Sequence, residues 1–200
     1  MNYLVHLYLS GPDPEHQIGG LMGDFVKGPL ADRYPVRIRQ GLHLHRRIDS
    51  FAHDHPDTRS SRQRLPDRYG HGRGIIIDIF YDHFLASAWS AYSVEPLPVY
   101  AARIYQLLQT YHDQLPPALR VVAPRMIAHN WLVSYQHRQA VGRALQRLAQ
   151  RLSRPLPLAE AVGDLARQED DFLGDFHRFM ASARRFAKRE INAVPTPAGA

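Results

Sequence analysis

Apolar residues recur along this chain in blocks of helical length, separated by proline and glycine. The block at 74–92 is long, apolar and without alternation, which favours a buried helix over a strand. Residues 57–68 are polar and arginine-rich, as in a loop or short helix. The pattern predicts helices over residues 2–9, 15–26, 35–54, 74–92, 97–115, 119–151 and 158–190. Asn2 is expected to cap the first of these helices, and the sixth is expected to be bent or broken near Tyr135. We therefore predict an all-α, single-domain bundle of about seven helices over residues 1–190, with a disordered tail at 191–200.

Composition narrows the class of protein. The chain has 200 residues, 44% of them hydrophobic, which suits one globular domain. No apolar run is long enough to cross a bilayer, and no signal peptide is evident, so we expect a cytoplasmic protein without membrane contact. The absence of cysteine excludes disulfides, thiolate zinc sites and a cysteine nucleophile. A formal net charge of +6 predicts an anionic partner, unless it only reflects an arginine-rich proteome.

Two carboxylates stand inside the most apolar of the predicted helices. Asp78 and Asp82 are four residues apart, so they share one helix face and repel each other. A bound cation is the simplest way to offset that repulsion in an apolar setting. Two exposed acids, or two acids paired with arginines, are the alternative.

Further imidazoles and carboxylates occur on the other early helices. His45 and Asp49 lie one helical turn apart and can share an ion, or Asp49 can simply pair with its neighbours at the surface. Asp24 lies near the end of a helix, where the macrodipole opposes a negative charge. His6 is set among apolar residues, where a hydrogen-bonded core histidine is the usual interpretation. Together these segments place candidate ligands on four helices, which is how bundles build metal sites.

The candidate ligands favour one kind of chemistry. Imidazole mixed with carboxylate suits Mn²⁺, Fe²⁺ or Mg²⁺ better than a structural zinc. Such ions polarise phosphoryl oxygens and activate water, so a basic protein with this site is expected to hydrolyse a phosphate ester. No P-loop, dinucleotide-binding glycine motif or serine nucleophile elbow is present in the sequence.

Four segments resemble the acyl carrier protein phosphodiesterase family. They occur in the order and spacing of that family, and they are residues 1–7 (MNYLVHL), 23–28 (GDFVKG), 41–49 (GLHLHRRID) and 78–85 (DIFYDHFL). The resemblance covers the first 90 residues well, and residues 130–135 (NWLVSY) are a weaker later match. It implies a divergent helical relative of the HD phosphohydrolases. The implied activity is hydrolysis of the phosphodiester between 4′-phosphopantetheine and a serine of holo acyl carrier protein, with a divalent cation, Mn²⁺ before Mg²⁺, Fe²⁺ or Co²⁺.

The resemblance also suggests roles for the candidate residues. The expected metal ligands are Asp24, His45, Asp78 and Asp82, with Asp49 or His6 in addition. His83 is expected to act from behind the ligands or as a general acid to the leaving serine oxygen. His43 and either Arg46 or Arg47 are expected to clamp the phosphate. His53-Asp54 is the sole His-Asp dipeptide, so ligands cannot be copied from ordinary HD enzymes.

Acyl carrier proteins are small and acidic, so a basic docking surface is expected. One candidate is the basic stretch before the Asp78 helix, and the other is a basic stretch near the C-terminus. For both stretches the alternative is an ordinary basic face in contact with solvent. The first comprises Arg59, Arg62, Arg64 and Arg68; the second comprises Arg184, Arg185, Lys188 and Arg189.

Three other functions fit the sequence less closely. One is a phosphohydrolase of nucleotides or small phosphate esters, and another is a non-enzymatic helical module that binds nucleic acid. The basic stretches contain few aromatic residues, so we expect no nucleic-acid partner. A haem-binding bundle is the third.

Overall fold

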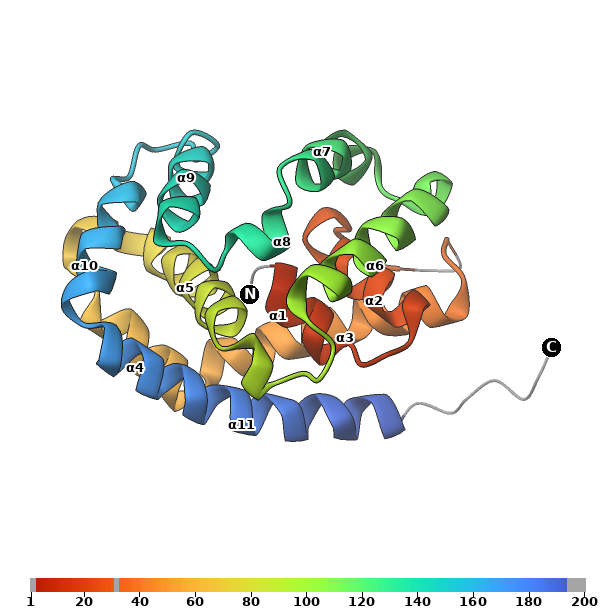
Figure 1. The fold of residues 1–200 in the computed structure, drawn as a ribbon, viewed down its shortest axis with the longest axis horizontal. Coiled ribbons are helices and arrows are strands. Elements are labelled where there is room, and N and C mark those ends of the chain that lie inside the picture. Colours follow the sequence, from red (N-terminus) through yellow and green to blue (C-terminus); the bar gives the residue numbers. More distant parts are fainter. Residues whose placement is uncertain (1–2, 31–32, 194–200) are drawn as a thin grey trace.

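The computed structural model describes residues 3–30 and 33–193, and within them every regular element is helical (Figure 1). The α-helices of this part are α1 (Tyr3–Leu9), α2 (Pro14–Met22), α3 (Val36–Asp54), α4 (Pro56–Arg64), α5 (Arg73–Ser87), α6 (Leu97–Thr110), α7 (Pro117–Ala128), α8 (Trp131–Ser134), α9 (Arg138–Ala149), α10 (Ala161–Arg167) and α11 (Glu169–Ala193). Short 3₁₀ turns are η1 (Gly23–Phe25), η2 (Asp67–Gly72), η3 (Trp89–Ala91), η4 (His112–Gln114) and η5 (Leu158–Glu160). The all-α prediction is confirmed.

The described residues form more helices than the seven expected, because two long predicted helices are broken and α4 forms in the segment expected as a loop or short helix. The segment 119–151 is divided into α7, α8 and α9, so the break predicted near Tyr135 is confirmed and a second break separates α7 from α8. Asn130 takes a left-handed conformation (φ 43°) before α8, and His137 is extended before α9. The segment 158–190 breaks at Gln168, between α10 and α11. Helix α11 continues through residues 191–193, whereas the rest of the expected tail, 194–200, and the proposed cap Asn2 lie outside the described residues.

Helix α5 forms the middle of the core, as its unbroken apolar sequence predicts. It packs against α1, α4, α9 and α11, so side chains on all of its faces are buried. The long helix α11 runs along one edge of the molecule and packs on α3 and α4 (Figure 1). Helices α1, α3 and α5 therefore meet in the interior, and they carry most of the predicted ligands. No helix in the described ranges has the length and apolarity needed to cross a bilayer.

Two glycines bring α2 and α3 unusually close together. A Cβ atom on Gly19 would lie 2.2 Å from the carbonyl oxygen of Ile38, and one on Gly41 would lie 2.4 Å from that of His16. A side chain at either position would push the helices apart. This close approach places η1, which follows α2, against the middle of α3.

Candidate metal and phosphodiester site

Side chains from α1 and α3 form a compact cluster of possible metal ligands. His6 comes from α1, while His45 and Asp49 lie one turn apart on α3. One ligand atom from each of the three lies within 4.8 Å of the others. The Nε2 atoms of His6 and His45 are 3.1 and 3.2 Å from the two carboxylate oxygens of Asp49. The spacing predicted for His45 and Asp49 thus gives a real contact, and tertiary packing adds His6.

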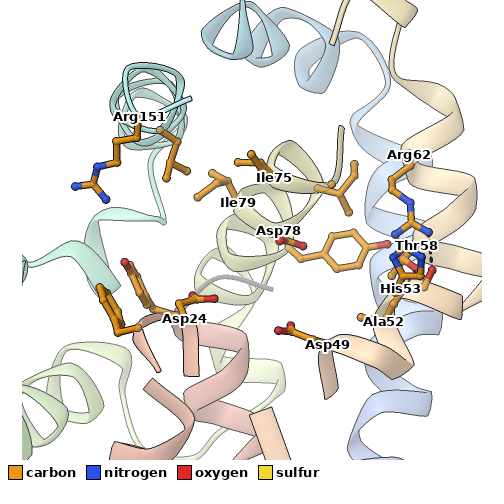
Figure 2. Close-up of a pocket in the computed structure, with 16 residues that line it drawn as sticks. Asp24, Asp49, Ala52, His53, Thr58, Arg62, Ile75, Asp78, Ile79 and Arg151 are labelled. Carbon is orange, nitrogen blue, oxygen red and sulfur yellow. Dashed lines mark hydrogen bonds between the residues drawn. The ribbon is translucent and has the colours of Figure 1, made fainter. Parts of the chain in front are cut away.

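Two further carboxylates face the same opening (Figure 2). Asp24 lies on η1, and its Oδ1 is 3.6 Å from Nε2 of His45. Asp78 extends from α5 into the opening from another side. The ring of His45 occupies the space beside Gly23, where a Cβ would come within 2.1 Å of it. The glycine before Asp24 therefore allows the imidazole and the carboxylate to be neighbours.

Hydrogen bonds orient both imidazoles toward Asp49. Nδ1 of His45 lies 2.7 Å from the carbonyl oxygen of Gly20, which can only accept, so Nδ1 carries a proton and Nε2 faces the carboxylates. Backbone carbonyls fix metal-binding histidines in this way. His6 is fully buried, and its Nδ1 has no hydrogen-bond partner among the residues that the structure describes. Its Nε2 faces Asp49 at 3.1 Å, so Nε2 is the atom directed at the candidate metal position.

The protonation states of the two imidazoles and of Asp49 depend on one another. Burial alone would lower the pKa of His45, but Asp24 and Asp49 outweigh it and raise that pKa to about 9. Burial, together with the neighbouring charge of His45, lowers the pKa of His6 to about 3. The two rings are stacked with centroids 3.7 Å apart, so only one of them can carry a charge. Burial opposes ionisation of Asp49, but hydrogen bonds from His45 and His6 lower its pKa below the usual range.

The donor set fits a divalent cation. Two Nε2 atoms and a carboxylate face one another, with a second carboxylate close by, and a proton on His45 supplies the positive charge that a cation would bring. His6, His45 and Asp49 thus form a candidate metal site.

Metal binding at this cluster is expected to release a proton. A metal binds the neutral imidazole, whereas the raised pKa of His45 keeps that ring protonated up to about pH 9. The affinity for Mn²⁺ should therefore rise about tenfold per pH unit from pH 7 and level off above pH 9. Calorimetry in buffers of different ionisation enthalpy should detect about one proton released at pH 7. Binding that is independent of pH would show that His45 is not a ligand.

The cluster meets a pocket of 490 Å³, a volume typical of small-ligand sites, through Asp49. His6 and His45 are buried, contact Asp49 and do not themselves line the pocket. Its walls come from η1, α3, α4, α5 and the turn after α9. Arg62 of α4 and Arg151 after α9 stand on opposite sides of the carboxylates (Figure 2). Their positive charges suit an anion held above the acids. Tyr3 also lines the pocket, and burial, with Asp24 nearby, raises its pKa to about 12, so its hydroxyl stays a donor.

Sequence reasoning missed several of the lining residues, and three of them carry polar groups that suit a phosphodiester. Arg151, Tyr3 and Thr58 come from segments far apart in the chain. Nothing in their local sequence distinguishes them from ordinary surface or core residues. Only the packing of α9 and α4 around α5 brings them together.

Asp82 is used differently from the prediction. Its carboxylate is completely buried and accepts hydrogen bonds from the backbone N–H groups of Leu4 and Val5, each at 2.9 Å. These are among the first amides of α1, which have no partner within their own helix. Asp82 lies one helical turn further along α5 than Asp78, and its carboxylate faces the first amides of α1 rather than the pocket. We therefore leave it out of the ligand set.

The structure also places two predicted catalytic histidines away from the pocket. The buried His83 donates from Nδ1 to the carbonyl oxygen of Tyr135 at 2.6 Å, facing the α8–α9 connection. His43 is exposed on the outer face of α3, because residues two apart on a helix point in different directions. Neither residue lines the pocket.

Most of the predicted phosphate-binding and docking arginines have partners within the chain. Arg46 donates to the carbonyl oxygens of Val26 and Gly28, and Arg47 pairs with Glu190. The two other paired arginines tie α4 and η2 to the C-terminal helices. Arg64 pairs with Asp171 and Asp175, and Arg68 pairs with Glu160 and Asp164. In the first basic stretch, Arg59 is exposed, and Arg62 lines the pocket and donates to the carbonyl oxygen of His53 at 2.7 Å.

The family described as acyl carrier protein phosphodiesterase matches residues 1–183 of this chain. A protein of that name from Klebsiella pneumoniae is 29% identical over 191 residues, covering 95% of this chain and 99% of the relative. The protein of the same name from Escherichia coli O157:H7 is 30% identical over 192 residues, covering 94% of this chain and 100% of the relative. No solved structure is significantly similar to the chain. The match over nearly the whole length, together with the early segments that carry the cluster, shows that the chain belongs to the acyl carrier protein phosphodiesterase family.

Proposed function

We propose that this protein hydrolyses the phosphodiester that joins 4′-phosphopantetheine to a serine of holo acyl carrier protein. The products are apo carrier protein and the free phosphorylated arm. The observation that carries this proposal is the imidazole–carboxylate cluster, whose Asp49 reaches a pocket flanked by Arg62 and Arg151. Membership of the family supplies the substrate.

His6, His45 and Asp49 would hold the divalent cation, with Mn²⁺ our first choice. Such an ion polarises a phosphoryl oxygen and makes water more acidic. Asp24 is the proton acceptor in this proposal. Partial desolvation at the pocket wall works against its ionisation, but His45 outweighs this effect and lowers the pKa of Asp24, so the carboxylate is ionised and can take a proton from the attacking water.

The other pocket residues have roles in positioning and in the departure of serine. Arg62 and Arg151 contact the non-bridging phosphoryl oxygens from opposite sides, and the Tyr3 hydroxyl donates to the same group. Burial raises the pKa of Asp78, so it retains a proton more readily than Asp24 or Asp49. We assign Asp78 to protonate the serine oxygen as its bond to phosphorus breaks.

The test is incubation of the purified protein with holo acyl carrier protein, with Mn²⁺ and with a chelator. Mass spectrometry should show complete loss of the prosthetic arm with Mn²⁺ and none with chelator. Activity should return when the metal is restored. If the arm remains in place while mononucleotides or small phosphate esters are hydrolysed, the substrate assignment is wrong and the related phosphohydrolase function replaces it.

A further inference from the structure

Helix α9 has two flanks with different surroundings. Arg138 lies on the flank that faces α11, where it pairs with Glu169. Arg143 and Arg147 lie one turn apart on the other flank, and Arg151 follows immediately after the helix. This second flank borders the pocket, because Arg151 lines the pocket and Arg147 lines the narrow cleft beside it. We call Arg143, Arg147 and Arg151 the α9 arginine row.

The α9 arginine row differs from Arg64 and Arg68 in having no acidic partner among the described residues. All three residues are exposed, and none forms an ion pair with any residue in the described ranges 3–30 and 33–193. Arg64 and Arg68, by contrast, are neutralised by acids of α10 and α11 and the turn before them. A net charge of +6 is therefore not spread evenly around the pocket, and this rim keeps its full positive charge.

The middle residue of the row, Arg147, is held in place by aromatic side chains. The guanidinium of Arg147 lies over the ring of Trp131, 4.9 Å from its centroid, and Tyr3 stacks on the same tryptophan at 6.5 Å. Helical geometry spaces Arg143 and Arg147 about 6 Å apart along the axis, and Arg151 continues the row to the pocket. A partner that contacts the row would thus present an acidic surface beside a phosphodiester held in the pocket. Cation–π contact fixes the Arg147 side chain and lowers the entropy cost of binding.

We propose that the α9 arginine row is the docking surface for the acidic surface of the carrier protein. This inference rests on the proposed function, since the carrier protein must bring its phosphodiester to the same pocket. A nucleic acid is a poorer fit. Single strands bind by stacking bases on aromatic faces, whereas Arg147 and Tyr3 already pack on Trp131.

The test compares two charge-matched double variants. R143E/R147E reverses two charges of the row. R185E/R189E reverses two exposed charges on α11 that belong to the second docking stretch suggested by the sequence. For R143E/R147E we expect KM for holo carrier protein to rise at least about tenfold and kcat to stay within about twofold. The variant should also bind apo carrier protein at least about tenfold more weakly in a titration at low salt. R185E/R189E should match the wild type in both measurements.

The outcomes separate this inference from the proposed function. If the wild type binds carrier protein through the row but does not release the arm, the proposed function fails and the docking surface stands. Equal losses in both double variants would point to a general electrostatic effect and overturn the α9 site. Unchanged KM and binding in R143E/R147E would also overturn it. The proposal would also be overturned if DNA competed with carrier protein for the row as strongly as carrier protein itself binds.

Discussion

Asp49→Ala is expected to reduce kcat/KM for holo carrier protein by at least about 1000-fold, equivalent to about 4 kcal/mol. Among the residues that the structure describes, Asp49 is the one that pairs with both imidazoles of the cluster, at 3.1 and 3.2 Å. Its removal takes a ligand from the cation and leaves both histidines without their shared partner. Release of the arm, followed by mass spectrometry, measures the loss. Calorimetry with Mn²⁺ should show that binding is lost in parallel.

The matched control for Asp49→Ala is His43→Ala on the same helix. His43 is exposed and lies outside the pocket, so this variant should stay within about twofold of the wild type. Asp49 is partly exposed, so its replacement should leave the helical circular dichroism unchanged. If His43→Ala lost activity while Asp49→Ala kept it, the proposed site would be wrong, and the sequence-based role for His43 would be restored.

Local sequence predicted correctly those features that depend on a single helix. The apolar, non-alternating run at 74–92 predicted the buried central helix, and the four-residue spacing of His45 and Asp49 predicted a contact that the structure contains. The breaks around α8 and between α10 and α11 had weaker local signals. Asn130 adopts its left-handed conformation without a neighbouring proline or glycine. Tertiary packing, which sequence periodicity does not report, decides such positions.

The composition of the site depended on how helices are rotated against one another. Asp78 and Asp82 have the same local signal, but only Asp78 reaches the pocket, because α1 places its first amides over Asp82. His83 and His43 were also predicted from their positions beside candidate ligands in the sequence, but neither side chain lines the pocket. Arg151 is 73 residues from Asp78 in sequence and reaches the pocket only because α9 packs on α5.

Asp82→Ala is expected to lower the free energy of unfolding by about 2–4 kcal/mol, even in metal-free protein. The carboxylate accepts from two amides, those of Leu4 and Val5, and both residues are fully buried. Leaving buried N–H groups without an acceptor costs about 1–3 kcal/mol each, and water cannot readily replace the lost partner. For a chain of this length, the melting temperature should fall by about 5–15 °C.

Urea denaturation with and without chelator distinguishes this capping role from the ligand role that the sequence suggested. If Asp82 supports α1, the loss of stability in Asp82→Ala persists in chelator, and Mn²⁺ still stabilises the variant by mass action. Asp24→Ala is the matched control: Asp24 is exposed and beside His45, so its metal-free stability should change by less than about 1 kcal/mol. Should chelator erase the difference between Asp82→Ala and the wild type, Asp82 would belong among the metal ligands. Because α1 carries His6, a loosened α1 would also weaken the site indirectly, so stability in chelator, rather than activity, decides between the two roles.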